Sequence, residues 1–158
     1  MEKLIYIVVV AVLADTACAD VIEIPQGGYS IEADSTAKAT TPEYYKTLPT
    51  NVIFPRVIAK SFSLDSVILK STDPKEDLDS VLSRHAKEAK FSATKIHPFI
   101  TSSGINALRF ELVPLQPWKR NLLHRLIFRN SENHIICVGI YGRTDIADNI
   151  FSSVKLIQ

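Results

Sequence analysis

The feature that most constrains the fold is a pair of successive β-hairpin patterns in the second half of the 158-residue chain. The first pairs ATKIHPFIT with INALRFELVPL across Ser102-Ser103-Gly104, and the second pairs HRLIFRN with HIICVGIYGR across Asn130 to Asn133. Small polar residues and glycine favour tight turns because they tolerate the required backbone angles or bond to the backbone locally. These four segments predict neighbouring antiparallel strands.

Alternation along the two middle strands predicts a sheet with unlike faces. In ALRFELV apolar side chains alternate with charged ones, and HRLIFRN follows a similar pattern. We therefore expect one apolar side that helices cover and one charged side that is partly open to water. The apolar set is Leu108, Phe110, Leu112, Leu126 and Phe128, and the residues facing the other way are Arg109, Glu111, Arg125, Ile127 and Arg129.

A helix is predicted just before these strands, in STDPKEDLDSVLSRHAKEA. Asp73 is a suitable N-cap, Pro74 suits the first helical position, and Glu76 is placed to reach back to the cap. Apolar residues then recur at helical spacing, which predicts an amphipathic helix with one face on the sheet. The residues of this stripe are Leu78, Val81, Leu82, His85 and Ala89.

The other elements are shorter. VIEI (21–24) reads as a strand, PQGGYSIEA as a Gly-Gly turn and a second extended segment, and residues 34–49 as a loop or a weak helix around 42–46. RVIAKSFSL and SVILKST read as strands separated at Leu64-Asp65, although the first also fits a helix. TDIADNIFSSVKLIQ predicts a short helix capped by Thr144 or Asp145. The fold class is therefore α+β, an antiparallel sheet with helices packed on it.

The first residues predict export. Lys3 precedes the apolar run Leu4 to Leu13, and Ala17-Cys18-Ala19 places small residues where a signal peptidase reads them. A membrane span needs roughly 20 apolar residues, so this run fits a signal peptide cleaved after Ala19. Residues 20–158 then form one periplasmic or secreted domain. The alternative is a lipoprotein anchored at Cys18, although Asp15 occupies a position where an aliphatic residue is preferred.

The net charge and the cysteine content of the mature chain limit the kinds of partner and chemistry that we expect. Removing Glu2, Lys3 and Asp15 from the 17 acidic and 18 basic residues leaves a net charge of +2, which gives no argument for a nucleic-acid partner. Cys137 remains as a single cysteine inside the apolar run HIICVGIY, so no internal disulfide is expected. A thiol buried in such a strand behaves as a small inert hydrophobe.

No catalytic, cofactor or metal motif is found in the sequence. No G-x-S-x-G elbow or glycine-rich phosphate loop occurs, and His97, His124 and His134 lack metal-ligand spacing. A histidine on a helix stripe, such as His85, is more often packed than catalytic. We therefore expect no catalytic residue, no metal ion and no cofactor.

One basic and aromatic stretch, RFELVPLQPWKRNLLHRLIFRN, is a candidate protein-binding site. Its prolines bound a tip that holds the only tryptophan, a composition enriched at binding hot spots. The opposing interpretation is a solvated loop and a strand face whose arginines pair with Glu111. The candidate residues are Arg109, Trp118, Lys119, Arg120, His124, Arg125 and Arg129.

The order of elements resembles a known family. A G-Y-S-I segment, the SVILKST strand, the capped helix, two hairpins and the N-I-F-S-S-V-K-L ending are together similar to the PsbP-like α/β/α sandwich over Gly27 to Gln158. That family includes the extrinsic lumenal subunit of photosystem II and periplasmic proteins of the DcrB type. The resemblance implies an adaptor, a chaperone or a subunit that grips other proteins, with no shared catalytic set.

These observations lead to one functional hypothesis and two alternatives. We expect a non-enzymatic exported protein that binds another protein; one version is an immunity protein or inhibitor that occludes the active site of a toxin or envelope enzyme. The first alternative is a secreted hydrolase in which His85, His97 or His124 meets a carboxylate or hydroxyl from elsewhere in the chain. The second is a lipid or small-ligand carrier with an apolar pocket.

Overall fold

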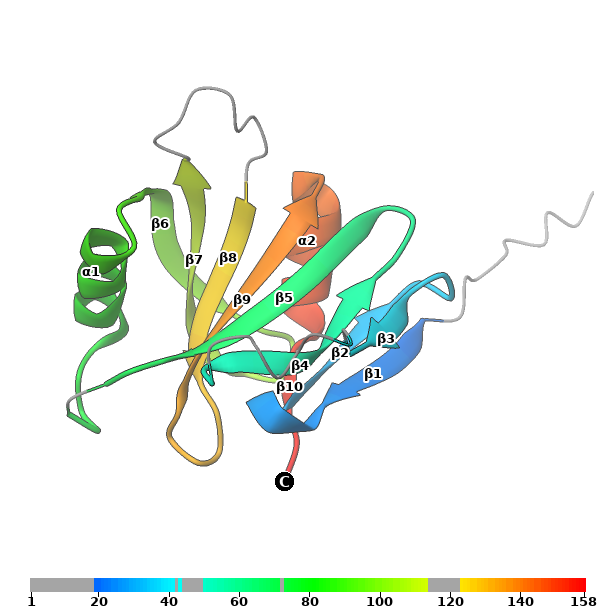
Figure 1. Ribbon diagram of the computed structural model, residues 1–158, viewed down its shortest axis with the longest axis horizontal. Coiled ribbons are helices and arrows are strands. Elements are labelled where there is room, and N and C mark those ends of the chain that lie inside the picture. The colour runs from blue at the N-terminus through cyan, green and yellow to red at the C-terminus, as the bar shows by residue number, and fades with distance from the viewer. Residues whose placement is uncertain (1–18, 42, 44–49, 72, 114–122) are drawn as a thin grey trace, which may run out of the picture.

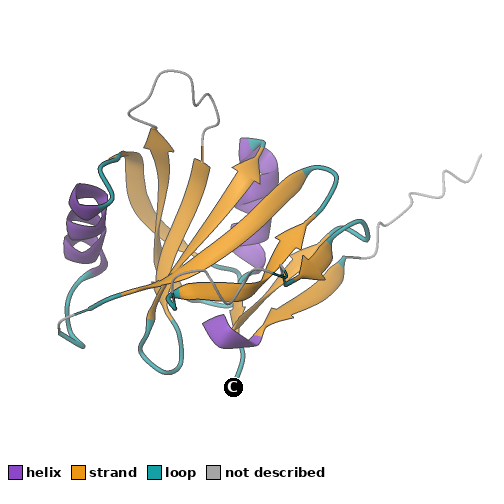
Figure 2. Cartoon of the chain, viewed as in Figure 1, coloured by secondary structure: helices purple, strands orange, loops and turns teal. Residues whose placement is uncertain are grey.

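The fold is built around one long antiparallel sheet (Figures 1 and 2). The computed structural model describes residues 19–41, 43, 50–71, 73–113 and 123–158. In spatial order the seven strands are β3 (Lys38–Thr40), β4 (Val52–Ile58), β5 (Phe62–Leu69), β9 (Ile135–Gly142), β8 (Leu123–Arg129), β7 (Asn106–Val113) and β6 (Ser92–Ile100). Every neighbouring pair is antiparallel.

In the part of the chain that the structure describes, two α-helices and a second, smaller sheet accompany the large sheet. Helix α1 (Leu78–Glu88) lies on one side of the large sheet, and α2 (Thr144–Ser153) follows β9. The small sheet contains β1 (Asp20–Ile24), β2 (Tyr29–Ala33) and β10 (Lys155–Leu156), with the 3-10 turn η1 (Pro25–Gly27) between its first two strands. The predicted α+β class, an antiparallel sheet with helices packed on it, is confirmed.

Layers cover both faces of the large sheet. Ile127 and Cys137 pack with α1 in one core, whereas Leu126 and Val138 pack with α2 and the small sheet in a second core. Tyr29 of the small sheet packs edge-on against a phenylalanine of β8 and donates a 2.9 Å hydrogen bond to a serine of β5. The molecule is therefore a sandwich of α1, the large sheet, and a mixed layer of α2 with the small sheet.

The prediction of a charged side partly open to water is wrong. Arg109 and Glu111 are only 3% and 4% exposed, because α2 covers their side of the sheet. The register pairs Phe110 with Arg125 and Arg109 with Leu126, so the apolar sets of β7 and β8 face opposite layers. Alternation identifies which residues of a strand share a face, but it does not reveal that α2 covers the face that carries Arg109 and Glu111.

The two predicted hairpin turns are confirmed, and one predicted strand break is wrong. Gly104 in the first turn has φ +85°, a backbone conformation that favours glycine. The break between β4 and β5 falls at residues 59–61, and both Leu64 and Asp65 lie inside β5. Leu64 is buried in the core, and the Asp65 carboxylate receives a hydrogen bond from Arg125, so this apparent turn pair suits a strand.

In the polar segment 34–49 the structure places the short strand β3, where the sequence suggested a loop or weak helix. Residues 42 and 44–49, which hold most of the suggested helix, lie outside the described residues.

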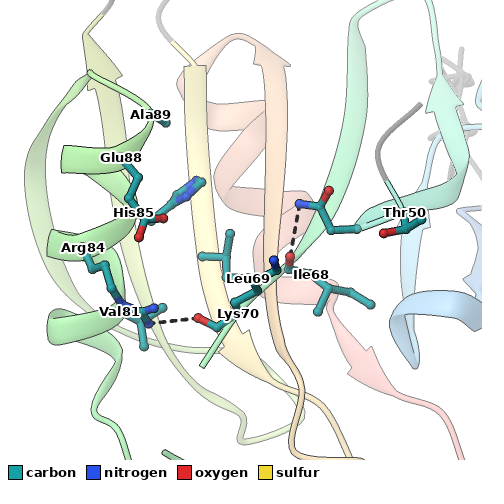
Figure 3. Close-up of a pocket in the computed structure, with 10 residues that line it drawn as sticks. Thr50, Ile68, Leu69, Lys70, Val81, Arg84, His85, Glu88 and Ala89 are labelled. Carbon is teal, nitrogen blue, oxygen red and sulfur yellow. Dashed lines mark hydrogen bonds between the residues drawn. The ribbon is translucent and has the colours of Figure 1, made fainter. Parts of the chain in front are cut away.

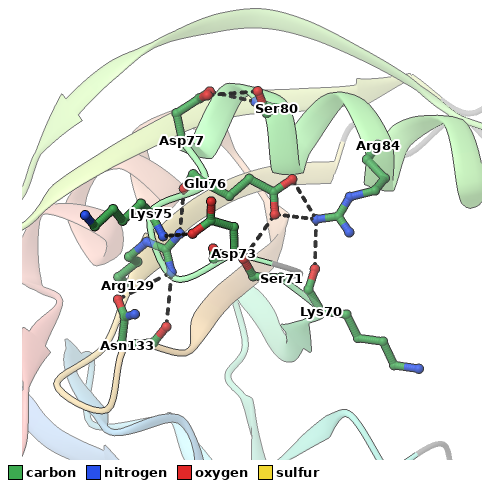
Figure 4. Close-up of polar contacts among 10 residues, drawn as sticks. All are labelled: Lys70, Ser71, Asp73, Lys75, Glu76, Asp77, Ser80, Arg84, Arg129 and Asn133. Carbon is green, nitrogen blue, oxygen red and sulfur yellow. Dashed lines mark hydrogen bonds and ion pairs between the residues drawn. The ribbon is translucent and has the colours of Figure 1, made fainter.

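Helix α1 begins four residues later than predicted. Its N-cap is Asp77, whose carboxylate accepts a 2.8 Å hydrogen bond from the Ser80 amide. Asp73 instead holds a turn, in which its side chain accepts from the Lys75 amide at 2.8 Å (Figure 4). The segment contains two capping signals in succession, and the helix uses the one directly before its first apolar residue, Leu78.

Helix α2 also starts differently from the prediction. Its N-cap position is Arg143, without a side-chain cap bond, so neither Thr144 nor Asp145 serves as the cap. The helix buries Ala147, Ile150 and Phe151. Cys137 is a free, buried cysteine in β9, as the sequence indicated.

The predicted signal peptide and the alternative lipid anchor at Cys18 lie in residues 1–18, outside the described residues. In the part of the chain that the structure describes, no helix is long and apolar enough to cross a membrane.

Candidate functional site

A groove of about 570 Å³ separates α1 from the end of β5 (Figure 3). One wall comes from α1 and includes Val81, Arg84 and His85. The facing wall comes from the end of β5 and from the residues just before β4, and it includes Asn51 and Leu69. Among the described residues, the 11-residue helix α1 is the helix on this face of the seven-stranded sheet, and it leaves the groove beside it.

Apolar side chains lie in the groove and charged groups surround them. Leu69 and Val81 are buried, at 6% and 1% exposure. Lys70 and Glu88 lie at opposite sides of the opening (Figure 3). An apolar centre within a polar rim is the usual anatomy of a protein-binding surface, and the volume is also within the range of small-molecule sites.

His85 projects from α1 into this groove (Figure 3). Its ring packs edge-on against Phe91, with centroids 5.3 Å apart. Within the described part of the chain its ring nitrogens make no hydrogen bond. Burial, followed by the nearby positive charge of Arg125, lowers the pKa of His85, so its neutral ring offers one donor and one acceptor to a bound molecule.

A polar cluster fixes the helix wall of the groove (Figure 4). Nη2 of Arg84 donates to both carboxylate oxygens of Glu76, at 2.9 and 3.1 Å, and to the carbonyl of Lys70 at 2.9 Å. Arg129 donates from Nη2 to the Glu76 carbonyl and from Nη1 to the Asn133 carbonyl. These bonds tie the start of α1 to β5 and β8, so the groove has a fixed width at this end.

Arg125 lies on the same face of the sheet, deeper than the groove. Its Nη1 donates a 3.0 Å hydrogen bond to Asp65, whose other carboxylate oxygen is 3.7 Å from Arg56. Among the described residues, the buried Nε of Arg125 has no hydrogen-bond partner. The guanidinium fits only because Gly139 lies beneath it, since a Cβ there would come within 2.3 Å of Nη1.

Arg109 and His124 lie on the opposite face, under α2. Arg109 Nε donates to Asp148 at 3.0 Å, and Nη2 donates to Nδ1 of His124 at 2.8 Å. The guanidinium also lies 5.2 Å from the ring centroid of Phe151. Because arginine has no acceptor, Nδ1 of His124 must be the unprotonated nitrogen, and burial together with Arg109 lowers the pKa of this histidine.

The sequence-predicted binding residues are therefore dispersed. Arg109 and His124 are buried under α2, Arg125 lies on the α1 face, and Arg129 lies at the other end of β8 near the start of α1. The remaining three, Trp118, Lys119 and Arg120, lie outside the described residues. Binding of a partner by this set stays a prediction.

The hydrolase alternative requires a histidine beside a carboxylate or hydroxyl, and the described residues meet this requirement only in part. Nδ1 of His124 is 3.6 Å from Glu111, but this histidine is 1% exposed and its Nδ1 is occupied by Arg109. His97 is exposed and its ring bonds to the Lys95 carbonyl at 2.8 Å. In the described ranges no three His, Cys, Asp or Glu side chains form a group that could hold a metal ion. The hydrolase alternative stays a prediction.

Sequence reasoning missed most of the groove. Its lining comes from three segments, around residues 50–51, 68–70 and 81–89, which carry no shared motif. The sequence placed His85 on the helical stripe, but it interpreted this histidine as a packed residue and not as part of a binding groove.

Comparison with solved structures identifies a similar fold. The solution structure of cyanobacterial PsbP (CyanoP) from Synechocystis sp. PCC 6803 superposes with a TM-score of 0.62 and 12% sequence identity, over 90% of this chain and 95% of that chain. No family model matches the sequence, and no curated protein matches it. The PsbP-like fold is therefore confirmed, whereas the resemblance to proteins of the DcrB type stays a prediction.

Proposed function

We propose that this chain is a non-enzymatic exported protein that binds another protein in the groove between α1 and β5. The observation that carries the proposal is the combination of buried Leu69 and Val81 with a half-buried His85 whose ring nitrogens have no partner among the described residues. Because these nitrogens are not among the buried atoms of the described residues, they stay open to the groove, and a partner can replace their water with direct hydrogen bonds.

The charges of the groove favour an acidic partner segment. Lys70, Arg84 and His85 line it, with Glu88 as the acidic side chain in the lining. We propose an extended segment whose apolar side chain packs on Leu69 and whose carboxylate faces Lys70 and His85. Binding of such an acidic segment of a partner protein is consistent with an immunity protein or inhibitor, and also with an adaptor or chaperone.

Export is part of the proposal. Strand β1 begins at Asp20, the residue proposed as the mature N-terminus, and Asp20 pairs with Ala33. Cleavage after Ala19 would therefore leave every described strand intact. Mass spectrometry of the mature protein tests cleavage after Ala19. An N-terminus at Asp20 supports this cleavage, whereas an acylated Cys18 shows that the protein is a lipoprotein anchored at that residue.

Ala89 provides a test of the groove. It lines the groove and is exposed, so Ala89→Trp fills the space without entering the core. Ser83→Trp is the matched control, because Ser83 is exposed on the same helix and does not line the groove. Tagged protein carrying each change is expressed in the native host and used for affinity capture.

The proposal expects one partner protein that the unchanged chain and Ser83→Trp retain and Ala89→Trp loses. A partner that the unchanged chain and both variants retain contradicts the groove as the binding site. Trp118→Ala then tests the proline-bounded stretch that the sequence predicted as a binding site.

The groove volume also favours a second candidate, a small-ligand carrier. Native mass spectrometry that finds a small molecule bound to the unchanged chain and absent from Ala89→Trp would select the carrier over the protein binder.

A further inference from the structure

A balanced cluster of charges lies between α2 and the large sheet, buried at its centre and exposed at Asp148 and Lys95, whose side chains are 48% and 71% exposed. Arg109 and Glu111 of β7 and His124 of β8 are 3%, 4% and 1% exposed. Asp148 of α2 pairs with Arg109 at 3.0 Å, and Lys95 of β6 pairs with Glu111 at 3.0 Å. Two cations and two anions therefore cancel, provided that the ring of His124 is neutral.

Protonation of His124 would disturb this balance at one atom. Nδ1 accepts the 2.8 Å hydrogen bond from Nη2 of Arg109, so a proton on Nδ1 places two donors against each other. Two carboxylates act on the ring, Glu111 at 3.6 Å and Asp148, but Glu111 is already paired with Lys95 and Asp148 with Arg109. Protonation would therefore add one uncompensated positive charge at a ring that is 1% exposed, which is unfavourable.

The same guanidinium connects His124 to α2. Arg109 holds Asp148 through Nε, and Asp148 is 48% exposed at the edge of an open hollow that Gly142 and Thr144 also line. At this hollow Arg143 and Asp145 form an exposed ion pair of their own, at 3.0 Å, so neither compensates a charge on His124. One planar guanidinium makes both bonds, together with a 2.6 Å bond from Nη1 to the Phe110 carbonyl, so a shift of this group away from His124 also moves Nε relative to Asp148.

We propose that His124 is an acid-operated latch whose protonation breaks the Arg109–Asp148 bond and leaves the N-terminal half of α2 held by apolar contacts, including those of Ala147. The C-terminal half stays in place, because Phe151 is fully buried and Ser153 bonds to the backbone of Glu32 at 2.9 Å. An exported protein that meets acidic surroundings would thereby change the surface formed by the start of α2. This inference does not depend on the α1 groove.

Amide hydrogen exchange followed by NMR tests the latch. The protection of the Asp148 and Asn149 amides, corrected for the intrinsic effect of pH, is compared between pH 7.5 and 5.0 with that of Val138 in β9. The expected result is a loss of at least tenfold for the two α2 amides relative to Val138. Equal protection at both pH values overturns the proposal.

His124→Gln and His97→Gln separate the latch from other histidines. Glutamine stays neutral, so His124→Gln should abolish the pH response, whereas His97→Gln, at an exposed position, should keep it. A pH response that survives His124→Gln overturns the proposal. If His124→Gln does not fold, the unchanged chain still decides: the α2 amide shifts must titrate with the midpoint of the His124 ring, and a midpoint belonging to another histidine contradicts the latch.

Discussion

Gly139→Ala is expected to destabilise the protein by displacing Arg125. The new Cβ would lie 2.3 Å from Nη1 of Arg125 and 2.7 Å from Oδ1 of Asp65, well inside van der Waals contact. The guanidinium must move by about 1 Å or more to reach an ordinary contact distance. Such a movement breaks its 3.0 Å hydrogen bond to Asp65.

The magnitude follows from two opposing contributions. Arg125 and Asp65 are 14% and 21% exposed, so their hydrogen bond is largely shielded, and a bond between charged groups contributes about 1.5–3 kcal/mol. Replacing glycine by alanine restricts the unfolded chain and restores about 0.4–1 kcal/mol. The net loss in the free energy of unfolding is therefore about 0.5–2.6 kcal/mol, which urea denaturation of residues 20–158 measures.

A double-mutant cycle with Arg125→Met tests the cause. Without the guanidinium there is no close contact, so Gly139→Ala should be neutral or slightly stabilising in the Arg125→Met background. An equal loss in both backgrounds would refute the reasoning, because the damage would then come from the strand itself.

Three further results are expected. Leu82→Ala should lower the free energy of unfolding by about 2–5 kcal/mol, because Leu82 is 2% exposed in the α1 core; a urea-denaturation change near zero would mean that the helix face is wrongly assigned. Asp77→Ala should destabilise more than Asp73→Ala in the same assay, because Asp77 caps α1, and the reverse order would place the helix start at Asp73. The pKa values of His85 and His124 are lowered in the folded state, so their contribution to stability is complete above the unfolded value of about 6.5 and is lost as the pH falls towards the folded values. Urea denaturation should therefore give lower stability at pH 5.5 than at 7.5, and His124→Gln should reduce that difference; an unchanged difference would assign it to other groups.

The hairpins were predictable because their signals are local. Each turn is a short run of residues suited to tight turns, and the flanking strands are continuous in sequence. The start of α1 was less predictable, since Asp73 and Asp77 both precede residues with helical spacing. The choice depends on where apolar side chains begin to pack, which is a tertiary effect.

The candidate site was the least predictable part. The sequence grouped Arg109, His124, Arg125 and Arg129 as one basic surface because they are close along β7 and β8. Alternation within β8 sends His124 and Arg125 to opposite layers, and the length of the strand separates His124 from Arg129. The groove instead forms between segments far apart in the chain, so no local pattern predicted it, and His85 was interpreted from the sequence as a packed residue.

Site-specific photo-crosslinking tests the proposed binding groove most directly. A photoreactive phenylalanine analogue is placed at Ala89, which lines the groove, or at Ser83, which does not, in the full chain expressed in its native host. The account predicts a light-dependent adduct with a second protein at position 89 and none at position 83. An adduct at position 83 with none at position 89 would contradict it.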